Sequence, residues 1–209
     1  MKRHVCAIAL ALVAGVALAA QAPEGWRMRV DRSTSASDPD APGDIKFVQH
    51  GSAFHAINPQ AAVYWHPSNT ASGSYTLKGT FTLMKPSGHT NYYGLVFGGS
   101  DLEAAAQRYL YFVVAQDGTW LIKRRDGDKT EEVSAKTPSD VVKKPDASGQ
   151  SINALEVRVS AATIDYVVNG TVVHSTPKTG PAATTDGLYG FRINHRLEVQ
   201  VDGFGVSTM

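Results

Sequence analysis

The chain has 209 residues, of which 43% are hydrophobic and 19% are charged, and its formal net charge at pH 7 is +1. The length allows one domain comfortably, and the composition is globular rather than disordered. A nearly neutral chain has no global field that attracts nucleic acid, so we expect no nucleic-acid partner.

The first residues have the pattern of a secretory signal peptide. Lys2 and Arg3 precede an almost wholly apolar stretch over residues 5–18, which ends in small residues. A run of about 14 apolar residues is shorter than the ~20 that span a membrane. We predict cleavage after Ala19, or as late as Ala22, followed by secretion or delivery to the periplasm. An uncleaved N-terminal anchor is the alternative.

Cleavage would remove the only cysteine, Cys6, and would leave a chain without disulfides. We therefore expect contact with a membrane only through the signal peptide, before cleavage. The expected organisation is a signal peptide over residues 1–19, an N-terminal segment over 20–44 that is partly loop, and one domain over 45–209.

Beyond residue 44 the hydrophobic pattern has a period of two. Apolar and polar residues alternate over 74–83, 155–159 and 197–202, as expected for strands of an antiparallel sheet with one buried face. Further strands are expected over 45–49, 53–58, 62–65, 92–97, 109–115, 119–125, 129–134, 163–168, 171–175 and 188–194.

Three dipeptides between these runs predict hairpin turns: Asp117-Gly118, Asp126-Gly127 and Asn169-Gly170. Loops are expected over 33–44, 135–150 and 176–186. Ser100-Asp-Leu-Glu103 has the form of a capping box, which predicts a short helix through residue 106.

More than ten short strands without intervening long helices predict an all-β fold. We expect a two-sheet antiparallel β-sandwich, or jelly roll. No 20–50-residue repeat of the kind that marks a propeller is present.

The order of strands and turns also resembles a known family. The stretches are Asn-Tyr-Tyr-Gly-Leu-Val-Phe-Gly at 91–98, the hairpin at 109–120, and the closing Gly-Leu-Tyr-Gly-Phe-Arg at 187–192 with Val-Asp-Gly-Phe-Gly-Val at 201–206. This order resembles the concanavalin A-like, laminin-G-like jelly rolls, and in particular the secreted bacterial 3-keto-disaccharide hydrolase-like group. The resemblance implies a concave sheet face that holds sugar or contacts a protein, with Arg192 among its lining residues.

One feature departs from the enzymes of this fold. Laminarinase-like enzymes carry an E-x-D-x-x-E run on one strand, and this sequence has none. Its closest acidic pairs are Glu131-Glu132, which point to opposite faces of a strand, and pairs in turns. A retaining glycosidase needs two carboxyl groups about 5 Å apart. We therefore assign no catalytic residue, and whether the protein is an enzyme stays open.

Aromatic and polar residues on the expected strands are the candidate sugar contacts, because sugar C–H faces stack on rings and polar side chains bond hydroxyl groups. Any of these aromatics can instead belong to the core. The candidates are Trp65, His66, Asn91, Tyr92, Tyr109, Trp120, Arg192 and His195.

Arg192 carries a specific expectation. Side chains alternate along a strand, so Arg192 should project opposite to Phe191 and Ile193. The structural alternative to a ligand contact is an ion pair with Glu198 or Asp202.

Metal binding is not predicted from spacing. The histidines form no H-E-x-x-H or similar motif. Asp38, Asp40 and Asp44 resemble half of a calcium loop, but Pro42 and Gln49 stand where ligands are expected. We therefore expect no cofactor, with a structural calcium as the alternative.

Three functions remain. The first is a secreted carbohydrate-binding or adhesion module whose partner is a glycan or small saccharide. The alternatives are a hydrolase acting on a glycoside or keto-sugar, and a structural envelope domain that makes protein contacts.

Overall fold

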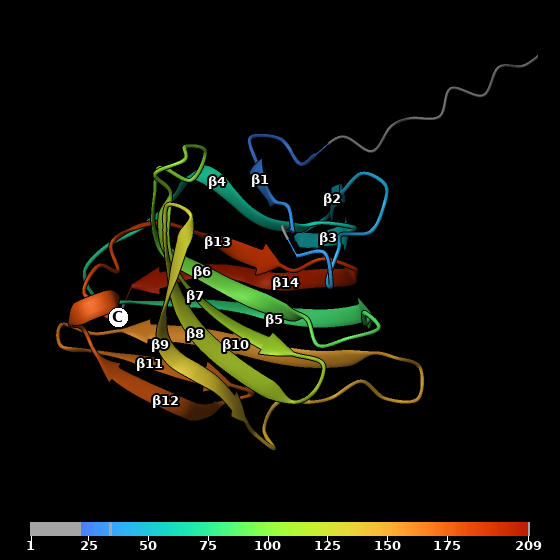
Figure 1. Cartoon of the computed structure of the whole chain (residues 1–209). Coiled ribbons are helices and arrows are strands. Elements are labelled where there is room, and N and C mark those ends of the chain that lie inside the picture. Colours follow the sequence, from blue (N-terminus) through green and yellow to red (C-terminus); the bar gives the residue numbers. More distant parts are fainter. Residues whose placement is uncertain (1–21, 34, 209) are drawn as a thin grey trace, which may run out of the picture.

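A computed structural model describes residues 22–33 and 35–208, which fold as two antiparallel β-sheets packed face to face (Figure 1). The expected signal peptide, including Cys6, lies outside these residues. Within the described part of the chain, no helix has the length and apolar character needed to cross a membrane. The predicted all-β two-sheet sandwich is confirmed.

The described residues form seven strands in each sheet. The first sheet has the spatial order β1 (Arg27–Asp31), β4 (Ala61–Ala71), β13 (Gly187–Ile193), β6 (Tyr92–Ser100), β7 (Arg108–Ala115), β8 (Thr119–Asp126) and β9 (Lys129–Pro138). The second has the order β12 (Thr171–Pro177), β11 (Thr163–Val168), β10 (Ser151–Val159), β5 (Tyr75–Lys85), β14 (Leu197–Thr208), β3 (Ala53–Asn58) and β2 (Lys46–His50). A 3-10 turn, η1, covers Gly180–Ala182.

The main core lies between the sheets and is built from alternate residues of each strand. Phe112 and Phe191 from the first sheet belong to one cluster with Leu77 and Phe81 from the second, and all four are fully buried. Burying such side chains contributes roughly 1.5–3 kcal/mol each. The period-two pattern of the sequence is therefore the pattern of this core.

The three predicted hairpin turns are present. Gly118 joins β7 to β8 and Gly127 joins β8 to β9, both with positive φ. Asn169 and Gly170 join β11 to β12 with φ of 49° and 83°. Positive φ at both central residues is what a tight hairpin requires, and Asn-Gly meets it at low cost.

The predicted helix at residues 100–106 is wrong. Ser100 instead pairs with Arg108 at the end of β6, and Asp101 has a φ of 52° that no helix contains. The Glu103 carboxylate accepts a hydrogen bond from Arg27 and so does not cap residue 100.

Several strands extend beyond their expected limits, among them β4, β10 and β14, and one strand, β1, lies where no strand was expected. β9 continues to Pro138, into the region expected to be loop. β1 lies within the segment expected to precede the domain, and it pairs with β4 from Arg27 opposite Trp65 to Asp31 opposite Ala61. The sandwich therefore begins well before residue 45, and this early strand supplies part of the site described next.

Candidate functional site

A second apolar cluster lies on the outer face of the first sheet, away from the main core. It contains Trp65, Val96, Tyr109 and Tyr111, with Leu102 from the connection between β6 and β7. These side chains come from strands whose alternate residues enter the main core. The middle of the first sheet is thus buried on both faces.

Beside this cluster lies a polar pocket of about 660 Å³. Asp31 of β1 and Arg192 of β13 line its centre, and Asn91 and His195 line the end where connecting segments enter β6 and leave β13. Arg125 of β8 lines another part. Pockets of 300–1,000 Å³ are the size that holds small ligands.

Arg192 is the central cation of this pocket. Its Nη1 donates a hydrogen bond to Asp31 Oδ2 in a close ion pair, and another to the Tyr109 hydroxyl at 3.1 Å. Its Nε donates to Asn194 Oδ1 at 3.1 Å. Among the described residues nothing accepts a hydrogen bond from Arg192 Nη2, so this nitrogen is available to a ligand.

Both members of the ion pair are held in their charged forms. Burial alone would raise the pKa of Asp31, but the charge and hydrogen bond of Arg192 lower it below the ordinary 3.8. Arg125 and Arg29 lower it further. Burial raises the pKa of Tyr109 to about 12 against the opposing charge of Arg192. At neutral pH the site therefore holds a carboxylate, a guanidinium and a neutral phenol.

A smaller hollow of about 210 Å³ adjoins the polar pocket and shares Arg192 and Asn194 with it. Tyr92 and Tyr111 line this hollow, and the Tyr111 ring centroid lies 5.7 Å from the guanidinium carbon of Arg192. Ring faces next to a charged group suit a ligand that has both apolar and polar surfaces.

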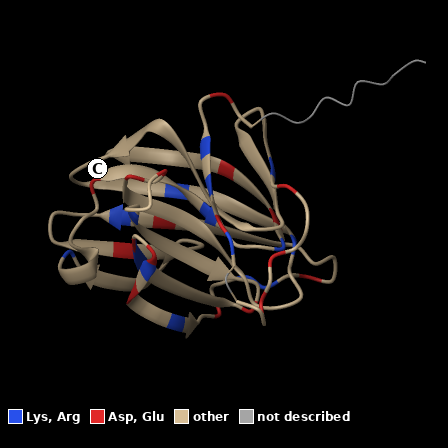
Figure 2. Cartoon of the chain, turned by 45° about the horizontal axis from the view of Figure 1, so that its top comes forward, with Lys and Arg blue, Asp and Glu red and all other residues tan. Residues whose placement is uncertain are grey.

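Charged residues of both signs surround the polar pocket. Figure 2 shows blue and red positions interspersed along the strands and connections rather than gathered in one field. The charged side chains that line the pocket are Arg29, Arg32, Arg125 and Arg192 against Asp31, Asp38 and Asp128.

The structure brings together some of the predicted sugar contacts. Asn91, Arg192 and His195 line the polar pocket, and Tyr92 lines the adjoining hollow. Tyr109 accepts a hydrogen bond from Arg192 but is only 2% exposed, so it lines neither the polar pocket nor the hollow. As alternation predicts, Arg192 projects away from the core that holds Phe191, but its acidic partner is neither Glu198 nor Asp202.

Three predicted contacts lie elsewhere. Trp120 projects into the main core, because the turn at Gly118 places it opposite Val114. Trp65 is on the outer face but only 2% exposed, so packing occupies its ring. His66, in the middle of β4, lies beside Ser68 and Trp26 and lines neither pocket. For these residues the core or local-contact alternative holds.

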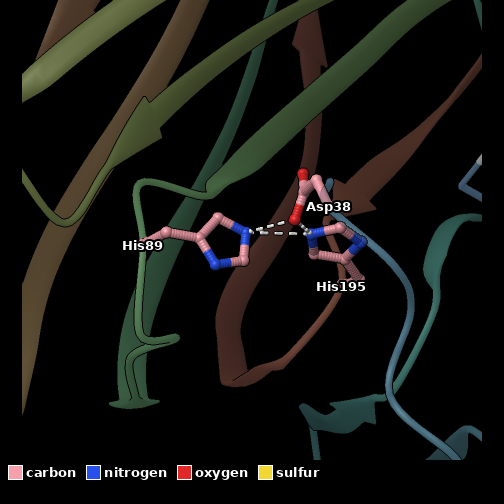
Figure 3. Close-up of side chains that lie close together, drawn as sticks. All are labelled: Asp38, His89 and His195. Atoms are coloured by element: carbon pink, nitrogen blue, oxygen red, sulfur yellow. Dashed lines mark hydrogen bonds and ion pairs between the residues drawn. The ribbon is translucent and has the colours of Figure 1, made fainter. Parts of the chain in front are cut away.

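A group that the sequence did not predict lies at the edge of the polar pocket. Asp38, His89 and His195 come from three connecting segments and point toward one another (Figure 3). In the described part of the chain, this is the group of metal-ligand side chains whose donor atoms converge. Because 51 and 106 residues separate its members, no spacing motif can reveal it.

The segment that resembled half of a calcium loop contributes to this group instead. Asp38 contacts the two histidines, and Asp40 accepts hydrogen bonds from the Ser33 backbone and from His195. Calcium takes six to eight oxygen ligands. The carboxylates of Asp38 and Asp40 are instead directed to nitrogen atoms.

No protein-family model matches the chain, and no curated protein matches it. Among solved structures it is similar to a carbohydrate-binding module, CBM66 from Bacillus subtilis, at 12% identity and a TM-score of 0.61, with 88% of this chain and 96% of that one covered. A protein of unknown function with a galectin-like fold from Bacillus subtilis gives 16% identity, a TM-score of 0.59 and coverages of 88% and 89%.

A putative glycosyl hydrolase from Parabacteroides distasonis gives 13% identity, a TM-score of 0.51 and coverages of 78% and 90%. At such low identities these similarities show the fold alone. The chain thus shares the β-sandwich fold of these structures, one of which is described as galectin-like.

Proposed function

We propose that this protein is a carbohydrate-binding module that holds a glycan or small saccharide on the outer face of its first sheet. The observation that carries the proposal is Arg192, which Asp31 anchors inside a pocket of about 660 Å³. One of its terminal nitrogens, Nη2, has no acceptor among residues 22–33 and 35–208. A guanidinium fixed in this way binds hydroxyl or carboxylate oxygens with little loss of side-chain entropy.

The adjoining hollow supports the same proposal. Tyr92 and Tyr111 offer ring surface next to Arg192, so one sugar ring can stack there while its oxygens reach the guanidinium. Similarity in fold to a carbohydrate-binding module adds weight without naming the ligand.

A glycan-array screen followed by titration tests this proposal. Arg125→Ala and Tyr92→Ala each remove one wall of the site without breaking the Arg192–Asp31 pair. Arg158→Ala, on the outer face of the second sheet, is the matched control. Loss of a charged hydrogen-bond donor costs ~1.5–3 kcal/mol, so Arg125→Ala should weaken binding about tenfold to a hundredfold.

The control should bind like the parent. A parent that binds no glycan would overturn the function, and a ligand whose affinity neither pocket variant changes would overturn the site.

A hydrolase acting on a glycoside or keto-sugar is the second candidate. One observation favours it: Asp31, Asp38 and His195 present two carboxylates and an imidazole to the same pocket. Such groups can carry protons in a hydrolysis. Product analysis of every bound glycan distinguishes the two, because a binding module returns its ligand intact.

The third candidate, a structural envelope domain, finds less support. The exposed large hydrophobic residues in the described chain are Met28, Ile152 and Val172, on three strands that are not neighbours in either sheet. They form no continuous apolar face of the kind that marks a protein contact.

We also propose that the protein is exported after cleavage of residues 1–19. N-terminal sequencing of material recovered outside the cytoplasm should begin at Ala20. Finding Met1 on that material would overturn the proposal.

A further inference from the structure

We propose that Asp38, His89 and His195 form a binding site for a divalent transition-metal ion, with zinc as the ion that fits it best. The site does not depend on sugar binding, and its test contains no saccharide. Asp38 lies between β1 and β2, His89 between β5 and β6, and His195 between β13 and β14. The fold brings the side chains from these three connections together, and they point toward one another (Figure 3).

The distances between donor atoms fit one shared ion. His89 Nε2 lies 2.9 Å from Asp38 Oδ1 and 3.1 Å from His195 Nε2, and His195 Nε2 lies 3.2 Å from Asp38 Oδ1. Ligands bound to zinc at about 2.0–2.1 Å in a tetrahedron are about 3.3 Å apart. The three atoms therefore have nearly the spacing of one face of a zinc coordination sphere.

Proton counting at His89 also favours a cation. Besides Asp38 and His195, the Asn91 amide nitrogen lies 2.9 Å from His89 Nε2. A ring nitrogen has either one proton or one lone pair, so it cannot satisfy three such neighbours. A metal ion between the three donor atoms turns the His89–Asp38 and His89–His195 contacts into ligand–ligand contacts.

The Asn91 amide then has a complete set of acceptors. Its two N–H groups point to Ser87 Oγ at 3.2 Å and to the His195 carbonyl at 3.1 Å. With these two bonds made, Asn91 ties the His89 loop to the His195 turn and needs nothing from the His89 ring. Asn91 is 4% exposed, so this bracing is internal.

His195 has the outer partner that metal-bound histidines usually have. Its Nδ1 donates to Asp40 Oδ1 at 3.0 Å. This bond leaves Nε2 as the lone-pair nitrogen and aims it at Asp38 and His89. A carboxylate on the far nitrogen fixes the ring orientation and increases its basicity as a ligand.

The donor set selects the class of metal. Two imidazoles and one carboxylate suit zinc and related first-row ions, whereas calcium and magnesium require oxygen donors. The side chains of His89 and Asp38 are 37% and 46% exposed, so a bound ion would keep a position open to solvent. Asp38 and His195 also line the polar pocket, and an oxygen of its ligand can fill that position.

The test is metal titration of the untagged protein after chelator treatment and dialysis. Zn²⁺ is added in competition with a chromophoric chelator, and Co²⁺ reports coordination by its absorption spectrum. We expect one Zn²⁺ per chain, a tetrahedral or five-coordinate Co²⁺ spectrum, and no stoichiometric binding of Ca²⁺ or Mg²⁺. The melting temperature should rise with Zn²⁺, because an ion that binds only the native state stabilises it.

Four variants locate the ion. His89→Ala and Asp38→Asn change half-exposed side chains and should each weaken Zn²⁺ binding more than a hundredfold, beyond the 10–100-fold typical of losing an outer partner. Asp40→Asn should weaken it by about that 10–100-fold. His55→Ala is the matched control, because His55 pairs with Glu198 at 2.9 Å without a third converging ligand.

Circular dichroism establishes that each variant is folded. Absence of stoichiometric Zn²⁺ binding by the parent overturns the site. So does an affinity that His89→Ala and Asp38→Asn leave at the level of His55→Ala, which would make the cluster a hydrogen-bonded brace alone.

Discussion

The outer faces of the two sheets differ in a way that separates scaffold from site. On the second sheet, β5 and β10 alternate regularly between buried and solvent-facing residues. On the first sheet, β6 and β7 are buried at nearly every position. The first sheet therefore has two packed faces, and its outer one holds the aromatic cluster, the buried ion pair and both pockets.

The difference has a sequence signature that can be recognised. Strands with one wet face show strict alternation, whereas strands buried on both faces appear as continuous apolar runs. Residues 92–97 and 109–115 are such runs in the printed sequence. In an antiparallel sandwich, a run of this kind marks a strand whose outer side chains are also buried. In this protein both pockets lie on the sheet that contains such strands.

The largest expected effect concerns the two ion pairs on these outer faces. Arg192→Ala leaves the largely buried Asp31, 11% exposed, beside the more distant Arg29 at 3.6 Å, and should cost about 3 kcal/mol of unfolding free energy, the low end of the range for a buried pair. Arg158→Ala breaks a more exposed pair with Glu156 and should cost at most about 1 kcal/mol. Urea denaturation measures both.

The double variant Arg192→Met with Asp31→Leu sharpens this result. Replacing a buried ion pair by apolar residues of similar size is often neutral, so stability should largely return. Equal losses for Arg192→Ala and Arg158→Ala would contradict the contrast between the two faces.

The second prediction compares two buried tyrosine hydroxyls. The hydroxyl of Tyr109 accepts a hydrogen bond from Arg192 at 3.1 Å, so Tyr109→Phe should cost ~1.5–3 kcal/mol. The hydroxyl of Tyr166, in the main core, is buried without a hydrogen-bond partner among the described residues. Tyr166→Phe should be neutral or slightly stabilising. Thermal unfolding of both variants decides, and a larger loss at Tyr166 would reverse the assignment of polar roles.

The third prediction concerns close approach of strands in the first sheet. A Cβ at Gly190 would lie 2.0 Å from the carbonyl oxygen of Tyr64 on β4. A backbone oxygen cannot move aside without distorting the sheet. Gly190→Ala should therefore lower the unfolding free energy by about 1–3 kcal/mol, the range typical of overpacking. Gly205 on β14 has open space around the same position. Gly205→Ala should be nearly silent in the same melting experiment, and a comparable loss there would show that strand glycines matter for another reason.

The fold was predictable because its main signal is local. Alternation and the three Asp-Gly or Asn-Gly turns identify most strands from adjacent residues. β1 escapes prediction because only Met28 and Val30 of its five residues are apolar, and neither belongs to the main core. The helix expected at 100–106 does not form: the capping-box pattern is local, whereas Ser100 pairs with Arg108 on the neighbouring strand and Asp101 takes a positive φ.

The site was only partly predictable for the same reason. Alternation gives the face on which Arg192 projects, but its partner Asp31 is 161 residues distant. Likewise, nothing local connects Asp38 to His89 or His195. One local feature is shared by Asp38, His89 and His195: each lies in a connection between strands, where functional side chains gather.

The smallest expected effect is a pH dependence confined to the first sheet. Because Arg192 lowers the pKa of Asp31 below 3.8 in the folded protein, ionised Asp31 contributes stability above its unfolded pKa of about 3.9. That contribution is lost as pH falls through the lower, folded value. The difference in unfolding free energy between the parent and Asp31→Asn should therefore shrink when urea denaturation is repeated at pH 3 instead of pH 5.

Glu156→Gln is the control, because solvent and salt screen its pair with Arg158. Its difference from the parent should change less over the same interval. If the difference in unfolding free energy between the parent and Asp31→Asn stayed constant down to pH 3, the charge of Asp31 would not contribute to stability. The outer faces of the two sheets would then differ in packing alone.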